Sequence, residues 1–106
     1  MENTGISNAF LTFMQEAPEY SQAWMEMVQK LDAANPLEEK TKTLAYLAVL
    51  AAAGLTGGVP FHVRHAKACG ATRQEIIGAV LVGLPAVGHA VVQALPAAIA
   101  AYDSEA

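Results

Sequence analysis

The chain has 106 residues, of which 54% are hydrophobic and 15% charged, and its formal net charge is −4. A chain of this length forms one domain, here residues 1–106, and buries roughly two-thirds of its unfolded surface. The six Lys and Arg residues are scattered and form no basic stripe of the kind that binds phosphates, so we predict no nucleic-acid partner. The apolar excess indicates that part of the surface lies in a subunit interface.

The sequence also predicts where the protein works. A single cysteine, Cys69, excludes an intramolecular disulfide, and the N-terminus lacks the pattern of a secretion signal, so we expect a reducing cytoplasm. Residues 76–102 carry no formal charge and are long enough to span a membrane. However, Pro85, Pro96 and several glycines divide this stretch, and His89 lies within it. We therefore predict buried or interfacial helices and no membrane partner.

The N-terminal part predicts two helices. The first runs from about Ser7 to Glu16, and Pro18 opens a second that ends before Asn35-Pro36. Both carry large side chains at helical spacing, which is typical of core packing. The aromatic residues Phe10, Phe13, Tyr20 and Trp24 can wall a hydrophobic pocket, but core packing needs the same spacing, and we expect these four residues in the core.

The middle of the chain predicts the centre of the core. Glu38 and Glu39 lie in the first turn of a third helix, where negative charge suits the helix dipole, and Leu44 to Ala53 is apolar on nearly every side. A turn rich in glycine then leads into a helix from Phe61 to Cys69 that stops at Gly70. This turn places His62 at a helix N-terminus.

The C-terminal part predicts two further helices. Thr72-Arg73-Gln74-Glu75 forms a capping box at the start of a helix from Arg73 to Val82. Pro85 begins a last helix with small residues on all faces, which favours contact with another subunit. No alternating pattern typical of strands is present. The sequence therefore predicts an all-α domain of about six helices with a central antiparallel helix pair.

Three stretches lie in a specific order between Leu37 and Ala90: LEEKTKTLAYLAVLAAAG, FHVRHAKACGATRQEI and VGLPAVGHA. They resemble the opening helix, the histidine helix with its capped turn, and the Gly-x-Pro-Ala signature of the carboxymuconolactone decarboxylase and alkylhydroperoxidase AhpD-like family. The order of His62, Gly70 and Glu75 is the most specific part of the resemblance. It implies the AhpD-like helical fold, a family core at about residues 37–90, and assembly into homotrimers or homohexamers.

AhpD-type members of this family carry the pattern C-x-x-C-x-x-x-H, and Leu55 and Gly58 stand at the two cysteine positions here. Disulfide exchange needs an attacking thiolate and a resolving sulfur, so a dithiol peroxidase cycle is excluded within one subunit. The relay glutamate of those members corresponds to Thr43, whose hydroxyl is no acid or base near neutral pH. The stretch PFHVR resembles the decarboxylase branch of the family. The acidic residue that this branch carries four positions before the histidine is replaced by Gly58 here.

His62 is the candidate catalytic residue, because an imidazole exchanges protons near neutral pH and the glycine-rich turn would leave its ring at a cleft. The alternative is a structural histidine that binds a backbone carbonyl. Arg64 is a candidate substrate-binding residue that can reach a carboxylate of a ligand or of a neighbouring subunit. An ordinary ion pair at the surface or an interface is its alternative.

His62, His65 and Cys69 recur at spacings of three and four, so they lie on one helical face. They can bind zinc with His89 as a fourth ligand, or His65 can favour a reactive thiolate at Cys69. The alternative is inert packing, and we predict no metal and no cofactor. His65 and His89 are further candidate substrate-binding residues. His89 can face His62, or it can be a hydrogen-bonded histidine of the core or an interface.

Three functions from different classes are open. The first is an enzyme that acts on a small carboxylated lactone or keto acid, with His62 transferring the proton and Arg64 or His65 holding the carboxylate. The second is an antioxidant protein in which peroxide oxidises Cys69 and an external thiol reduces it. The third is a noncatalytic oligomeric binding module. Among enzymes, a decarboxylase-like lyase is favoured over a dithiol peroxidase because both family cysteines are missing.

Overall fold

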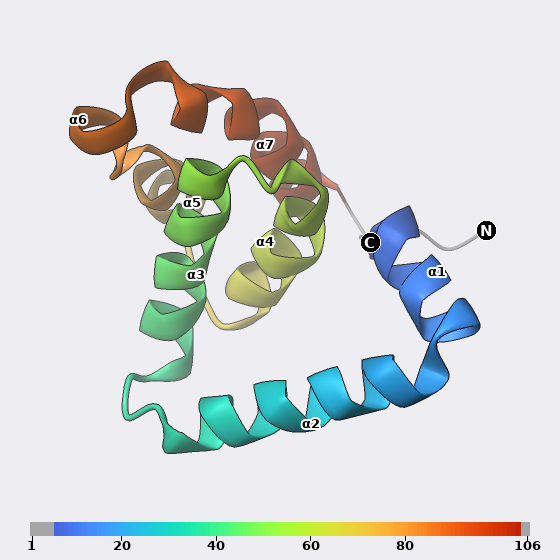
Figure 1. The fold of residues 1–106 in the computed structure, drawn as a ribbon. Coiled ribbons are helices and arrows are strands. Elements are labelled where there is room, and N and C mark those ends of the chain that lie inside the picture. The colour runs from blue at the N-terminus through green and yellow to red at the C-terminus, as the bar shows by residue number, and fades with distance from the viewer. Residues whose placement is uncertain (1–5, 105–106) are drawn as a thin grey trace.

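A computed structural model describes residues 6–104, and in this range every regular element is helical (Figure 1). The predicted all-α fold is confirmed. Two short 3₁₀ segments, η1 and η2, join the α-helices. In chain order, the elements are α1 (Asn8–Glu16), α2 (Pro18–Ala34), α3 (Glu39–Ala53), η1 (Thr56–Gly58), α4 (Val59–Ala68), α5 (Arg73–Leu81), α6 (Leu84–Val87), η2 (Gly88–Ala94) and α7 (Leu95–Asp103).

The core lies between α3, α4, α5 and α7. Helices α3 and α4 run antiparallel and pack against each other, which agrees with the predicted central pair (Figure 1). Leu47 of α3 is completely buried, and α4 contributes Val59 and Val63 at the same depth. α3 is therefore the central helix of the core, as its apolar sequence predicts. The other large and fully buried side chains are Ile76, Val80 and Val91.

The capping box at the start of α5 is present as predicted. The Thr72 Oγ1 atom accepts a hydrogen bond from the Glu75 amide at 3.1 Å, and the Thr72 amide donates to Glu75 Oε1 at 2.8 Å. Two amides that the helix itself leaves without acceptors are thereby satisfied.

Replacing Thr72 with alanine removes one of these two bonds. We expect the free energy of unfolding to fall by about 1 kcal/mol, as for other N-cap residues. Urea unfolding followed by circular dichroism measures the loss. Gln74→Ala, at an exposed position of the same helix, is the control, and an equal loss in both variants would contradict the capping role.

The expectation of a single helix from Pro85 onward is wrong, because the chain forms three short elements there. Gly88 adopts φ 71° and ψ −148°, a conformation that ends α6, and Pro96 lies in the first turn of a new helix, α7. By length and composition alone, the helical stretch Arg73–Asp103 is apolar enough to cross a membrane among the described residues. In the structure this stretch folds back, so that α5 packs against α7.

Polar contacts fasten the end of α7 to the α4–α5 connection. The Tyr102 hydroxyl donates to the Ala71 carbonyl at 2.9 Å, and Lys67 Nζ donates to the Tyr102 carbonyl at 2.7 Å. Arg73 forms two parallel hydrogen bonds with the Asp103 carboxylate, at 3.0 and 3.1 Å. These contacts close the helical core at the end of α4 opposite His62.

Helices α1 and α2 form an arm that leaves this core, and α2 packs chiefly against α1 (Figure 1). In both helices only Ser21 is buried. The expectation that the aromatic residues of this region fill the core is therefore wrong for Tyr20 and Trp24, which are 74% and 47% exposed. Phe10 and Phe13 are half-buried and pack edge to face, with ring centroids 6.0 Å apart.

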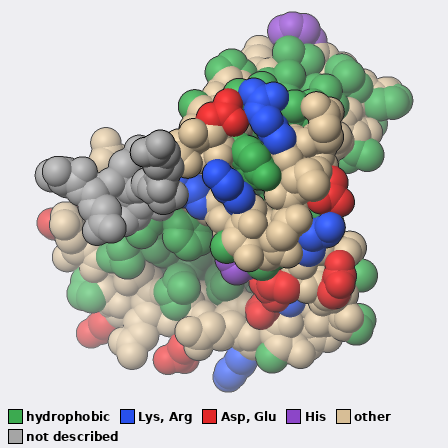
Figure 2. Space-filling view, turned by 180° about the vertical axis from the view of Figure 1, so that it is seen from behind, with side chains coloured by type: hydrophobic (Ala, Val, Ile, Leu, Met, Phe, Trp, Pro, Cys, Tyr) green, Lys and Arg blue, Asp and Glu red, His purple; other side chains and the backbone are tan. Residues whose placement is uncertain are grey.

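The arm and the α5–α6 connection expose most of the large apolar side chains. Figure 2 shows hydrophobic side chains gathered in patches on the face opposite to that in Figure 1. Patches of this kind mark interaction surfaces in soluble proteins. In the described residues, the exposed large side chains are Leu11, Met14, Tyr20, Trp24, Met25, Met27, Val28, Leu31, Leu37, Tyr46, Val49, Leu55, Phe61, Val82, Leu84 and Val87.

Candidate functional site

A groove of about 560 Å³ lies between the arm and the central helix pair. Helix α2 forms one wall, and α3 and α4 form the other. One part of the lining is apolar and includes Trp24, Met27, Val28, Leu31, Tyr46 and Phe61; the polar part includes Asp32, Asn35, Glu39, Lys42, His62 and His65.

His62 lies in the first turn of α4, directly after Pro60 and Phe61. Its ring packs against Tyr46 of α3, with centroids 4.7 Å apart, and against Phe61, with centroids 5.2 Å apart. Burial, and after it the charge of His65, lowers the pKa of His62 below its ordinary value. His62 is therefore neutral at physiological pH and has a nitrogen lone pair that can accept a proton.

His65 lies one helical turn after His62 and contacts a carboxylate from α3. Its Nε2 atom is 3.0 Å from Glu39 Oε2. The hydrogen bond with His65 is the largest cause of a lowered pKa at Glu39, so this carboxylate stays ionised near neutral pH. Both side chains are about half exposed and line the groove, so a ligand in the groove can reach them.

Sequence reasoning missed Glu39, although a signal for it exists. Glu39 precedes Thr43 by four residues, and His65 follows His62 by three. Because α3 and α4 run antiparallel, both steps lead in the same direction along the helix pair. An acid and a histidine thus face each other one turn away from the pair that the resemblance placed at Thr43 and His62. Thr43 itself is buried and donates its hydroxyl to the Glu39 carbonyl at 2.8 Å.

Lys42 joins the acidic groups at the polar end of the groove. Its Nζ atom contacts the Asp32 carboxylate at the end of α2 and lies 3.4 Å from Glu39 Oε1. The hydrogen bond with Asp32 is the largest cause of a raised pKa at Lys42. The polar end therefore contains a cation between two carboxylates.

The structure does not bring Arg64 and His89 to this groove. The Arg64 Nη2 atom donates to Ser104 Oγ at 3.2 Å, which directs the guanidinium to the end of α7. His89 is exposed on η2, and neither residue lines the groove. The groove thus contains two of the candidate histidines, His62 and His65.

Cys69 is half-buried at the C-cap of α4. Its Sγ atom lies 3.9 Å from His65 Nε2, which is the same nitrogen that contacts Glu39. When this nitrogen donates to the carboxylate, it has no lone pair with which to take a proton from the thiol. Among the described residues, no group of three or more His, Cys, Asp or Glu side chains is arranged to hold a metal ion.

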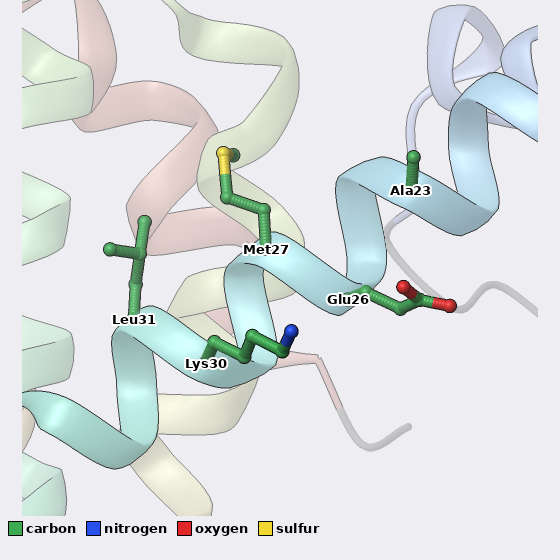
Figure 3. A pocket seen from close by; sticks show the side chains of 5 residues that line it. All are labelled: Ala23, Glu26, Met27, Lys30 and Leu31. Atoms are coloured by element: carbon green, nitrogen blue, oxygen red, sulfur yellow. The ribbon is translucent and has the colours of Figure 1, made fainter.

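A second hollow of about 380 Å³ lies on α2 alone and shares Met27 and Leu31 with the groove (Figure 3). Figure 3 shows Met27 and Leu31 directed toward the rest of the chain, whereas Glu26 and Lys30 point to another side of the helix. A single helix cannot enclose a small molecule. This hollow is a feature of the exposed arm, and the groove at His62 is the better candidate site.

The fold and the groove define a class of small all-α proteins with a histidine at the start of the helix that follows a glycine-rich turn. The model of the carboxymuconolactone decarboxylase family matches residues 18–100. The match covers most of the chain and includes α2, so the protein belongs to this family. No curated protein and no solved structure matches the sequence significantly.

Proposed function

We propose that the protein is a lyase-type enzyme in which His62 accepts and returns a proton during a reaction of a small carboxylated lactone or keto acid. The observation that carries this proposal is the half-buried His62, whose pKa is lowered by burial, in a groove lined by both apolar and polar groups. A base that is neutral near the working pH and shielded from water is suited to general base catalysis.

The two parts of the lining fit the two parts of such a substrate. Trp24, Tyr46 and Phe61 offer aromatic surfaces to a carbon skeleton. Lys42 is the cation at the polar end of the groove, and a substrate carboxylate competes there with Asp32 and Glu39. The groove therefore supports Lys42, in place of Arg64, as the residue that binds the substrate carboxylate.

The antioxidant alternative has less support. Peroxide reduction at Cys69 needs a thiolate, and the nearby His65 nitrogen is occupied by Glu39. Cys69 also lies at the C-terminal end of a helix, where the dipole disfavours negative charge. We therefore assign Cys69 no redox role, and its thiol fits the reducing cytoplasm in which we place the protein.

A thermal-shift screen of small lactones, keto acids and matched neutral esters tests this function. A ligand present at 100 times its dissociation constant stabilises the folded state by about 2.7 kcal/mol. We expect a keto acid or carboxylated lactone to stabilise the wild type and not His62→Ala, and the neutral ester to have a weaker effect. If no compound distinguishes the two proteins, the enzyme proposal fails and the noncatalytic binding module is favoured.

We also propose that the protein is a homo-oligomer, a trimer or hexamer, in which a second copy covers the exposed arm. The support is the number of apolar side chains that α2 leaves exposed, since a helix with so little buried surface is not held by its own chain. A second copy of this chain supplies an apolar surface that matches the arm, because the same exposed patch is present on every copy.

The only tryptophan of the chain, Trp24, lies on α2 and reports on this contact. We expect its fluorescence to shift to longer wavelength when dilution dissociates the oligomer, in step with the mass measured by sedimentation. Tyr20→Asp, at a 74% exposed position of α2 outside the groove, should weaken assembly by at least tenfold, since burying a large apolar side chain contributes about 1.5–3 kcal/mol. Glu26→Gln, on another side of α2, is the control. A monomer at every concentration would refute the proposal.

A further inference from the structure

We propose that Glu39 and His65 form a second proton-transfer pair in the groove, so that the site removes a proton from carbon with one histidine and delivers a proton to a carbonyl oxygen with the other. This inference rests on the proposed function of His62 and names the substrate class more closely. The expected substrates are those keto acids and carboxylated lactones that carry a C–H bond beside a carbonyl group and can form an enol.

The first support is the position of the pair. Glu39 and His65 come from different helices, meet at 3.0 Å, and line the same groove as His62. His65 is also close enough to His62 for its charge to lower the pKa of His62. A single small molecule in the groove can therefore contact both histidines.

The second support is that both oxygens of the Glu39 carboxylate are engaged. Oε2 contacts His65 Nε2 at 3.0 Å, and Oε1 lies 3.4 Å from Lys42 Nζ. A carboxylate held on both sides fixes the orientation of the imidazole and favours a proton on Nε2, which leaves Nδ1 to exchange a proton with a substrate. Glu39 is thus a positioning residue that acts through His65.

The third support is the contrast between the two histidines. His62 packs against two aromatic rings and is half-buried, whereas the side chain of His65 is 44% exposed and faces an ionised carboxylate. The charged groups around His65 are Glu39 and Lys42 of α3, with Asp32 of α2 beyond Lys42; His62 and Cys69 flank it on α4. Two titratable groups in opposite environments are suited to separate base and acid roles.

The chemistry balances without a cofactor. His62 takes a proton from the carbon beside a carbonyl group, and the C–H electron pair becomes the C=C bond of an enol. The carbonyl π pair takes the Nδ1 proton of His65, which acts here in its doubly protonated form and keeps its Nε2 proton toward Glu39. In the return step the enol O–H proton goes back to His65, and His62 returns its proton to the same carbon or to a conjugated one. These proton transfers alone give an exchanged or isomerised substrate. Loss of CO₂ from a 3-keto acid gives the same kind of enol, which connects the two transfers with the proposed lyase reaction.

Exchange of α-protons in D₂O, followed by proton NMR, tests this proposal with 4-oxopentanoate as the probe. The wild type should exchange the protons beside the ketone, and His62→Ala should not. We expect His65→Gln to slow exchange by about 10²-fold, a typical contribution of a general acid, and Glu39→Gln by about tenfold. Glu26→Gln, at an exposed position outside the groove, is the matched control and should exchange as the wild type does.

Rescue by a conservative variant and a titration of Glu39 separate positioning from simple structural damage. Glu39→Asp should restore part of the rate. Carbon NMR of the Glu39 carboxyl gives a readout without any substrate, since its pKa should rise when His65→Gln removes the largest cause of its lowering.

The outcomes distinguish this inference from the proposed function. Equal exchange by the wild type, His65→Gln and Glu39→Gln, with loss in His62→Ala, would overturn the second pair and leave the role of His62 intact. An unchanged Glu39 titration in His65→Gln would overturn the pair as well. Exchange that is absent in the wild type, or unaffected in His62→Ala, would overturn the proposed function itself and the inference with it.

Discussion

Replacing Leu47 with alanine is expected to lower the free energy of unfolding by about 2–5 kcal/mol, the range for a buried leucine. Leu47 is completely buried in the middle of α3, the helix on which α4 and α5 pack. The substitution removes the transfer free energy of the deleted carbons and leaves a cavity that these helices cannot fully close. Urea unfolding, monitored by circular dichroism at fixed protein concentration, measures the loss.

Leu55→Ala is the matched control, because the chemical change is identical and Leu55 is 58% exposed. We expect it to change the free energy of unfolding by less than about 0.5 kcal/mol, as for an ordinary surface position. A small domain has only about 5–15 kcal/mol of stability in total, so Leu47→Ala should also lower the yield of folded protein. Similar losses in the two variants would mean that the core is not centred on Leu47.

Replacing His62 with alanine is expected to slow proton exchange at a keto-acid substrate by about 10²–10⁴-fold, the usual contribution of a general base. The side chain lies outside the fully buried core, so folding should change much less than the rate. Exchange of α-protons in D₂O measures the effect, and circular dichroism checks the fold. His62→Ala with a normal rate would assign the proton transfer to another group.

The wild-type rate should also depend on pH in a definite direction. His62 accepts a proton only in its neutral form, and its pKa lies below the ordinary value of 6.5. On its acid side, the rate should therefore decline only below that ordinary value. Addition of imidazole to His62→Ala should restore part of the rate, whereas the same addition should have little effect on the wild type.

Much of the helical core was predictable because it depends on local signals. The capping box at Thr72 and Glu75, the stop at Gly70 and the apolar run of α3 each act within a few residues, and the structure contains all three. The last helix was not predictable in the same way. The sequence around Gly88 is continuously apolar, so its pattern does not show that a helix ends there. The positive φ of Gly88 goes with the packing of the following 3₁₀ segment on the core.

The candidate site was only half predictable. The glycine-rich turn and the helix after it place His62 at a groove, and a spacing of three places His65 on the same face. Glu39 lies 26 residues before His65, and Tyr46 lies 16 residues before His62. Sequence spacing carries no information on such pairs until two helices are known to lie side by side in a definite register.

The sequence by itself determined the helical class, the family, the missing thiols and the candidate histidine, His62, because these depend on composition, short-range capping and motif order. The tertiary structure decided which partners that histidine has. It turned Arg64 to the end of α7, left His89 and Trp24 exposed, and brought Glu39 to His65. The physical reason is that side-chain neighbours across helices are set by packing register and by the direction in which each helix leaves the core, and neither property is encoded in local spacing.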